Sequence, residues 1–158
     1  MDLKLPGIGG LEALRRIVQR DPNAKVLVFS MHEEAPFVEQ ALAAGARGYV
    51  AKTSAPQSLV GALRQVAAGG EALAADIVER LAFARMRGPN SPLSDLSTRE
   101  FEIFCMLAEG RGAAEIAKRL SLSQKTVANY GTQLKSKLNV ASTAELTRLA
   151  IRHGIIAA

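Results

Sequence analysis

Three side chains of complementary chemistry stand beside short apolar segments in the first third of the chain. Asp2 supplies a carboxylate, Ser30 a hydroxyl that follows the apolar run 25–29, and Lys52 an ammonium group that follows 48–51. If both runs are parallel strands, their carboxyl ends meet at one edge of the sheet, where doubly wound folds bind ligands. A lone serine or lysine beside a strand is usually an ordinary surface residue, so the three side chains are informative only as a set.

The chain has few of the residues that hydrolytic or metal-dependent catalysis requires. Its two histidines, His32 and His153, are far apart, and no serine or cysteine lies in a recognisable nucleophile motif. The one cysteine, Cys105, excludes an internal disulfide and a multi-cysteine metal site, and its apolar neighbours indicate a buried thiol. We therefore expect a protein that is not an enzyme and has no catalytic residue.

The composition favours a helical or α/β protein. Of the 158 residues, 48% are hydrophobic and only 4% aromatic, which favours helices packed through alanine and leucine over a β-sandwich. No stretch approaches the ~18 consecutive apolar residues that a membrane-spanning helix needs, and the first 20 residues are charged, unlike a signal peptide. We expect a cytoplasmic protein.

A basic segment lies in the second half. The formal net charge is +5, and residues 111–137 contain six basic side chains but one acidic side chain. Alone, such a run is more often a solvated helix face than a nucleic-acid footprint. The spacing within 113–138 predicts two short helices joined by the turn 121–123, which is a helix-turn-helix or, with equal weight, an ordinary αα-hairpin. The inward face of the first of these helices is expected to hold Glu115, Ile116, Ala117 and Leu120.

In the first 70 residues, predicted helices alternate with predicted strands. Apolar spacing predicts helices at 10–20, 34–44 and 58–68 and strands at 25–29 and 48–51. This order is typical of a doubly wound α/β unit with a parallel sheet.

A Pro/Gly-rich break separates a second, helical part. A helix is expected at 71–87 and the break at 88–92. Beyond the break, helices are predicted at 98–109, 113–120, 124–138 and 142–153, which make a small bundle. We therefore divide the chain into a first part at 1–70, a linker at 71–94 and a second part at 95–158.

Six motifs give residues 95–156 a close resemblance to LuxR-type DNA-binding domains. They are Leu96-Ser-Thr-Arg-Glu100, Leu107-Ala-Glu-Gly110, Glu115-Ile-Ala117, Leu122-Ser123, Lys125-Thr-Val127 and Lys137-Leu-Asn-Val140. The chain departs from the family in three places: Gly112-Ala-Ala114 replaces a polar trio, Tyr130 the usual histidine, and Asn139 the usual glycine. The first departure removes side chains that could contact phosphates.

This resemblance implies that the helix 124–138 enters the major groove of DNA. Ser123 would cap the helix, and Lys125 and Thr126 would hold a phosphate at its N-terminus. Outward positions would read base edges, and an asparagine there can pair with adenine. The implied DNA-binding residues are Ser123, Lys125, Thr126, Ala128, Asn129, Tyr130, Thr132 and Lys135. For Tyr130, packing on a neighbouring helix is an equal alternative.

The first part resembles the receiver domain of NarL/FixJ-type response regulators. Residues 2–7 and 10–13 look like the segment around the phosphoacceptor aspartate, 25–30 like the fourth strand and 49–52 like the fifth. The resemblance implies that Asp2 accepts the phosphoryl group, that Ser30 and Lys52 contact it, and that Tyr49 changes rotamer as the switch residue.

The resemblance also implies a receiver that is truncated at its N-terminus. A complete receiver has two more strands, the first of which carries an acidic pair that binds Mg²⁺ together with the acceptor aspartate. Asp2 alone is an incomplete metal site, so we expect no cofactor and no phosphoryl transfer unless the missing strands are supplied. An exposed sheet edge predicts self-association. The sequence leaves open whether Met1 is a true start or whether the chain is a fragment.

We therefore expect an α/β plus all-α chain, in which a partial doubly wound, flavodoxin-like receiver precedes a four-helix LuxR-type helix-turn-helix bundle. Its expected function is DNA-binding transcriptional regulation in two-component signalling. The expected partners are double-stranded DNA, a second copy of the chain and, for the full-length parent, a sensor histidine kinase, but no membrane. The alternative is a protein-interaction module whose half receiver pairs with full-length response regulators. A steep fall of affinity with salt would favour the DNA-binding function.

Overall fold

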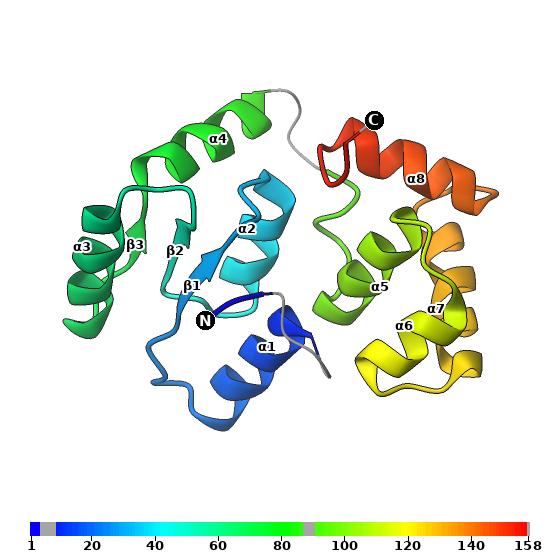
Figure 1. The fold of residues 1–158 in the computed structure, drawn as a ribbon, viewed down its shortest axis with the longest axis horizontal. Coiled ribbons are helices and arrows are strands. Elements are labelled where there is room, and N and C mark those ends of the chain that lie inside the picture. Colours follow the sequence, from blue (N-terminus) through cyan, green and yellow to red (C-terminus); the bar gives the residue numbers. More distant parts are fainter. Residues whose placement is uncertain (4–8, 87–90, 158) are drawn as a thin grey trace.

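The predicted alternation of helices and strands is present in the computed structural model, which describes residues 1–3, 9–86 and 91–157 (Figure 1). The first part contains α1 (Gly10–Arg20), β1 (Leu27–Ser30), α2 (Ala35–Ala43), β2 (Gly48–Ala51), α3 (Pro56–Ala67), β3 (Ala72–Leu73) and α4 (Ala75–Met86). The second part contains α5 (Thr98–Ala108), α6 (Ala113–Leu120), α7 (Gln124–Lys137) and α8 (Thr143–Arg152). The predicted fold class, α/β followed by all-α, is confirmed.

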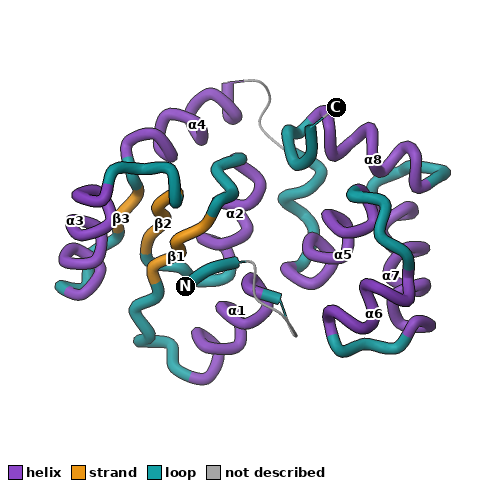
Figure 2. The backbone as a smooth tube through the Cα atoms, in the orientation of Figure 1, coloured by secondary structure: helices purple, strands orange, loops and turns teal. Residues whose placement is uncertain are grey.

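The first part is built on a parallel sheet with the strand order β1-β2-β3. Val28 and Val50 are fully buried on opposite faces of this sheet, because helices cover both faces. Helix α3 packs on one face, and α2 and α4 lie over the other (Figure 2). At the β1 edge, the N–H of Phe29 donates to the carbonyl of Met1 at 2.8 Å, so the start of the chain runs beside the sheet.

The segment after α3 differs from the sequence prediction. The helix expected from residue 71 begins at Ala75, and Ala72–Leu73 form a third strand instead. The N–H of Ala72 donates to the carbonyl of Arg47 at 2.9 Å, and two residues are too few to show a strand period. Helix α4 then packs on α2 and β2, with Ile77 and Leu81 in the core, so it is not a free linker.

One strand begins later than predicted: the strand expected from residue 25 begins at Leu27. Other predictions concern residues that the structure does not describe. Residues 88–90 of the predicted break and residues 4–7 of the motif at 2–7 lie outside the described residues. The division of the chain at residues 70 and 94 stays a prediction.

The second part is a bundle around α5, which packs against α7 and α8. Helices α6 and α7 meet at a tight turn whose first residue, Ser121, has a left-handed backbone with φ 54°. Ile116, Ala117 and Leu120 of α6 are buried as predicted, but Glu115 is exposed, which corrects its assignment to the inward face. Glu115 lies one position before the buried stripe and pairs with Arg111 at the surface.

The two parts share one hydrophobic core. Helix α1 packs against α5, and a continuous cluster of buried side chains extends from Leu14 in α1 to Ala150 in α8.

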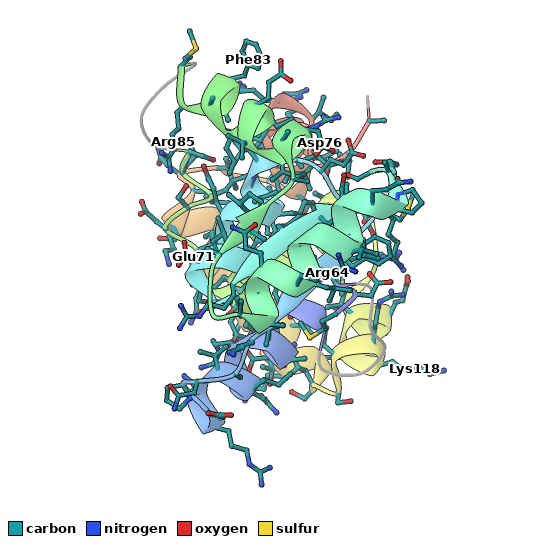
Figure 3. The ribbon with its side chains drawn as sticks, turned by 90° about the vertical axis from the view of Figure 1, so that its left-hand side faces the viewer. Arg64, Glu71, Asp76, Phe83, Arg85 and Lys118 are labelled. Atoms are coloured by element: carbon teal, nitrogen blue, oxygen red, sulfur yellow. The ribbon has the colours of Figure 1, made fainter. Side chains whose placement is uncertain are left out.

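The surface carries exposed side chains on both parts. Seen from the side of α3 and α4, Phe83 projects from the outer surface of α4 and Lys118 from α6 (Figure 3). Among the described residues, no helix combines the length and apolar content that crossing a membrane requires.

Candidate functional sites

The carboxyl edge of the sheet brings the predicted charged side chains together. Lys52 Nζ lies 2.5 Å from Asp2 Oδ2, and the two side chains are 31% and 32% exposed, so the ion pair is open to solvent. The N–H of Lys52 also donates to the carbonyl of Ser30 at 2.7 Å, which fixes the loop after β2 against the end of β1. Ser30 and Lys52 come together because of the parallel register, in which Ser30 pairs with Ala51. Asp2 reaches this edge because Met1, the residue before it, is hydrogen-bonded to β1.

Below this surface, Tyr49 and Ser30 are fully buried and both bind His32. The Tyr49 hydroxyl donates to the His32 carbonyl at 2.7 Å, and Ser30 Oγ accepts the N–H of His32 at 3.2 Å. Burial raises the pKa of Tyr49, and the nearby carboxylates of Glu34 and Asp2 add to the shift, so the phenol stays protonated as a donor. The sequence prediction found Ser30 and Tyr49 but missed His32, which lies in a loop without a pattern.

A metal ion at this edge of the sheet would need several ligands close to Asp2. Nowhere in residues 1–3, 9–86 and 91–157 do three histidine, cysteine or acidic side chains lie close enough to hold one ion. The described residues therefore hold no complete set of metal ligands, and the incomplete site at Asp2 stays a prediction.

In the second part, α7 presents the predicted outward residues. Ala128, Asn129 and Thr132 are exposed, with Thr132 Oγ1 donating to the Ala128 carbonyl at 3.3 Å. Ser123 caps the helix as predicted, because its Oγ accepts the N–H of Thr126 at 3.0 Å. Beside this cap, Lys125 is exposed.

Two of the predicted DNA-contacting residues are partly occupied by packing. Tyr130 is half-buried against the hydrophobic core, in line with the packing alternative, and Lys135 is half-buried as well.

The asparagine at position 139, where the family usually has glycine, has a structural explanation. This residue follows α7 with φ 53°, a left-handed conformation that asparagine tolerates better than other residues that carry a Cβ.

The basic face is smaller than the sequence count indicates. Arg111 pairs with Glu115 and, at 2.7 Å, with Glu109. Lys137 Nζ lies 2.9 Å from Glu100 Oε2, and Glu100 also forms a capping box with Ser97 at the start of α5. The acidic residues of the motifs therefore have structural roles. The exposed basic side chains that remain in this segment are Lys118, Arg119 and Lys125.

The contact between the two parts contains polar groups that the sequence prediction missed. Glu102 of α5 is 9% exposed, and its Oε1 accepts the N–H groups of Leu11 at 3.1 Å and Glu12 at 3.2 Å. Gln40 of α2 donates to the carbonyls of Leu93 at 3.2 Å and Leu96 at 2.9 Å. No local pattern could reveal these contacts, because each joins residues more than 50 positions apart.

Two families match the chain, one over each part. The receiver domain of response regulators matches residues 1–64, and the luxR family of bacterial regulatory proteins matches residues 94–150. Response regulator UvrY of Escherichia coli is 41% identical over 157 residues, which cover 98% of this chain and 72% of UvrY. Transcriptional activator protein ExaE of Pseudomonas putida is 46% identical over 159 residues, covering 99% of this chain and 74% of ExaE.

Solved structures show the same arrangement of elements. RcsB from Salmonella enterica serovar Typhimurium, bound to the promoter rprA with the phosphomimetic BeF3-, has a TM-score of 0.65 and 27% identity over 94% of this chain and 71% of RcsB. A structure of two RcsB dimers bound to two parallel DNAs has a TM-score of 0.51 and 26% identity over 94% of this chain and 71% of RcsB.

Proposed function

Because this chain belongs to the two-component response regulators that join a receiver domain to a luxR-family domain, we propose that it regulates transcription by binding double-stranded DNA through α7. The observation that supports this most directly is the exposed face of Ala128, Asn129 and Thr132 beside the capped N-terminus of α7. A helix N-terminus favours a phosphate, and the side chains beyond it can reach base edges.

The packing of the two parts is compatible with this function. The first part contacts α5 through α1, and α7 packs on α5 at the end of the molecule far from the sheet (Figure 1). Residues 128, 129 and 132 are exposed in this arrangement. We therefore infer that DNA can approach α7 without separation of the two parts.

We assign three classes of contact on this helix. Ser123, Lys125 and Thr126 position a phosphate at the helix N-terminus, where dipole and charge both favour an anion. Ala128, Asn129 and Thr132 read bases, with Asn129 as the main specificity residue. Tyr130 and Lys135 add contacts to the DNA backbone from the half-buried flank.

We propose two further partners. A second copy of the chain binds the same DNA, with the exposed Thr143 and Arg152 of α8 near the contact, and the RcsB dimers on DNA support this. A sensor histidine kinase is the partner of a complete receiver, in which Asp2 is the acceptor position and Ser30, Tyr49 and Lys52 are the response residues.

The experiment that tests the function is a titration of the chain with a selected promoter site and with random DNA at several salt concentrations. A DNA-binding function predicts a linear fall of log affinity with log salt, because each neutralised phosphate releases counterions. The alternative, a module that pairs with full-length response regulators through its receiver part, predicts little salt-dependent DNA binding and a complex with such a regulator. Affinity for DNA that does not change with salt would contradict the proposed function.

A further inference from the structure

A continuous series of contacts runs from the buried pair Ser30 and Tyr49 to the second part. It starts at His32, whose N–H donates to Ser30 Oγ at 3.2 Å and whose carbonyl accepts the Tyr49 hydroxyl at 2.7 Å. Both buried side chains therefore hold the backbone of one residue. A change in the position of either hydroxyl removes a hydrogen bond from His32.

The ring of His32 carries this link to α2. It stacks on Phe37 with a centroid distance of 4.0 Å and an interplanar angle of 15°. Glu34 Oε2 lies 3.5 Å from His32 Nδ1 and so restricts the orientation of the ring. The ring of His32 therefore links its backbone to the ring of Phe37 by direct contact.

From α2 the contacts continue into α5. Phe37 packs edge-on against Phe101, with ring centroids 5.1 Å apart and an interplanar angle of 83°. Phe37 is 8% exposed and Phe101 fully buried, so both rings belong to the core that the two parts share. Gln40, one turn after Phe37, holds the carbonyls of Leu93 and Leu96, so α2 contacts the second part through two neighbouring side chains.

We propose that His32 couples the Ser30–Tyr49 pair to the second part through Phe37 and Phe101. The inference rests on the proposed function, because it assigns a route from the receiver residues to the DNA-binding part. A movement of the Tyr49 hydroxyl shifts the His32 backbone, the stacked rings follow, and Phe101 changes its position in α5. His32 acts as a positioning residue, since it holds the link without contacting DNA.

The test uses amide NMR spectra of the full chain without DNA. Tyr49→Phe removes only the hydroxyl that donates to His32. We expect this substitution to shift the amide signals of Phe101–Cys105 as well as those of β2. In a His32→Ala background, the same substitution should still shift β2 but lose its effect on α5. Phe37→Leu removes the stacked ring and keeps an apolar side chain. In this background Tyr49→Phe should also lose its effect on the α5 signals, so Phe37→Leu replaces His32→Ala if that variant does not fold.

The other tyrosine of the chain provides a matched control. Tyr130→Phe removes a hydroxyl in α7, which packs directly on α5, so its effect on α5 signals should be the same with and without His32. The proposal is overturned if Tyr49→Phe leaves α5 unchanged, or if it shifts α5 equally in the parent, His32→Ala and Phe37→Leu backgrounds. Because no DNA is present, a failure here leaves the DNA titration unaffected, and the two results remain distinguishable.

Discussion

The carboxylate of Glu102 in α5 accepts a hydrogen bond from the backbone N–H of Leu11 in α1, at 3.1 Å. Helix α1 begins after Gly9, which has no side chain to cap it, so a residue of the second part completes a helix of the first. Gly9 has φ 84°, and a Cβ at this position would collide with the Glu102 carboxylate. Burial raises the pKa of Glu102 to about 7, in spite of the two backbone donors and the nearby Arg99.

This cap predicts a stability that depends on pH. A carboxyl with a raised pKa in the folded state stabilises the fold while it is protonated, and this contribution is lost as the pH rises from about 4.5 to about 7. Glu102→Gln keeps an acceptor for Leu11 and Glu12 and cannot ionise. Relative to the parent, the variant should therefore gain up to about 3 kcal/mol in free energy of unfolding between pH 5 and pH 8.

Chemical denaturation of both proteins at the two pH values measures this difference. Glu100→Gln is the control. The hydrogen bond from Lys137 lowers the pKa of Glu100 although burial opposes this, so Glu100 stays ionised throughout and its variant should differ from the parent by a constant amount. A constant difference for Glu102→Gln as well would contradict the prediction.

Asn129→Ala should reduce sequence specificity. The residue is exposed on α7, and loss of a bidentate contact to a base costs about 1–3 kcal/mol on the selected site with little change on random DNA. Fluorescence anisotropy with both DNAs measures the two affinities. Asn23→Ala, an exposed asparagine between α1 and β1, should leave both unchanged. Equal losses on the two DNAs after Asn129→Ala would show that the residue does not read bases.

Lys125→Ala should weaken binding to any sequence. Its ammonium group is exposed beside the N-terminus of α7, where it neutralises a phosphate. The slope of log affinity against log salt should decrease by about one, on selected and random DNA alike. Lys25→Ala removes the same charge from the loop before β1 and should keep the parental slope. If both variants change the slope equally, net charge and not a local contact controls binding.

Ser123→Ala should destabilise α7. The serine hydroxyl accepts the N–H of Thr126, and loss of such a cap costs about 1 kcal/mol. Ser136→Ala is the control, because Ser136 is exposed on the same helix and is not its N-cap. Alanine favours a helix more than serine does, so this variant should be as stable as the parent or slightly more stable. Thermal unfolding of the two variants is the measurement, and a loss for Ser136→Ala as large as that for Ser123→Ala would contradict the cap.

Local features of the structure were predictable from the sequence. Ser123 lies directly before an apolar helical period, and a cap acts on residues two or three positions away, so cap and helix appear together in one short segment. The edge formed by Ser30 and Lys52 was also predictable, because parallel strands place their carboxyl ends side by side. In these cases the physical interaction spans a few residues or follows from the topology.

Other features were decided by the tertiary structure alone. Two residues, Ala72 and Leu73, become a strand only because β2 offers them hydrogen-bond partners. Lys137 is paired with an acidic residue because the fold places Glu100, 37 positions earlier in the chain, beside it. The contacts of Glu102 with α1 and of Phe37 with Phe101 join segments 64 to 91 positions apart. Such pairs leave no periodic signal in the sequence, because their geometry exists only once both parts have packed into one core.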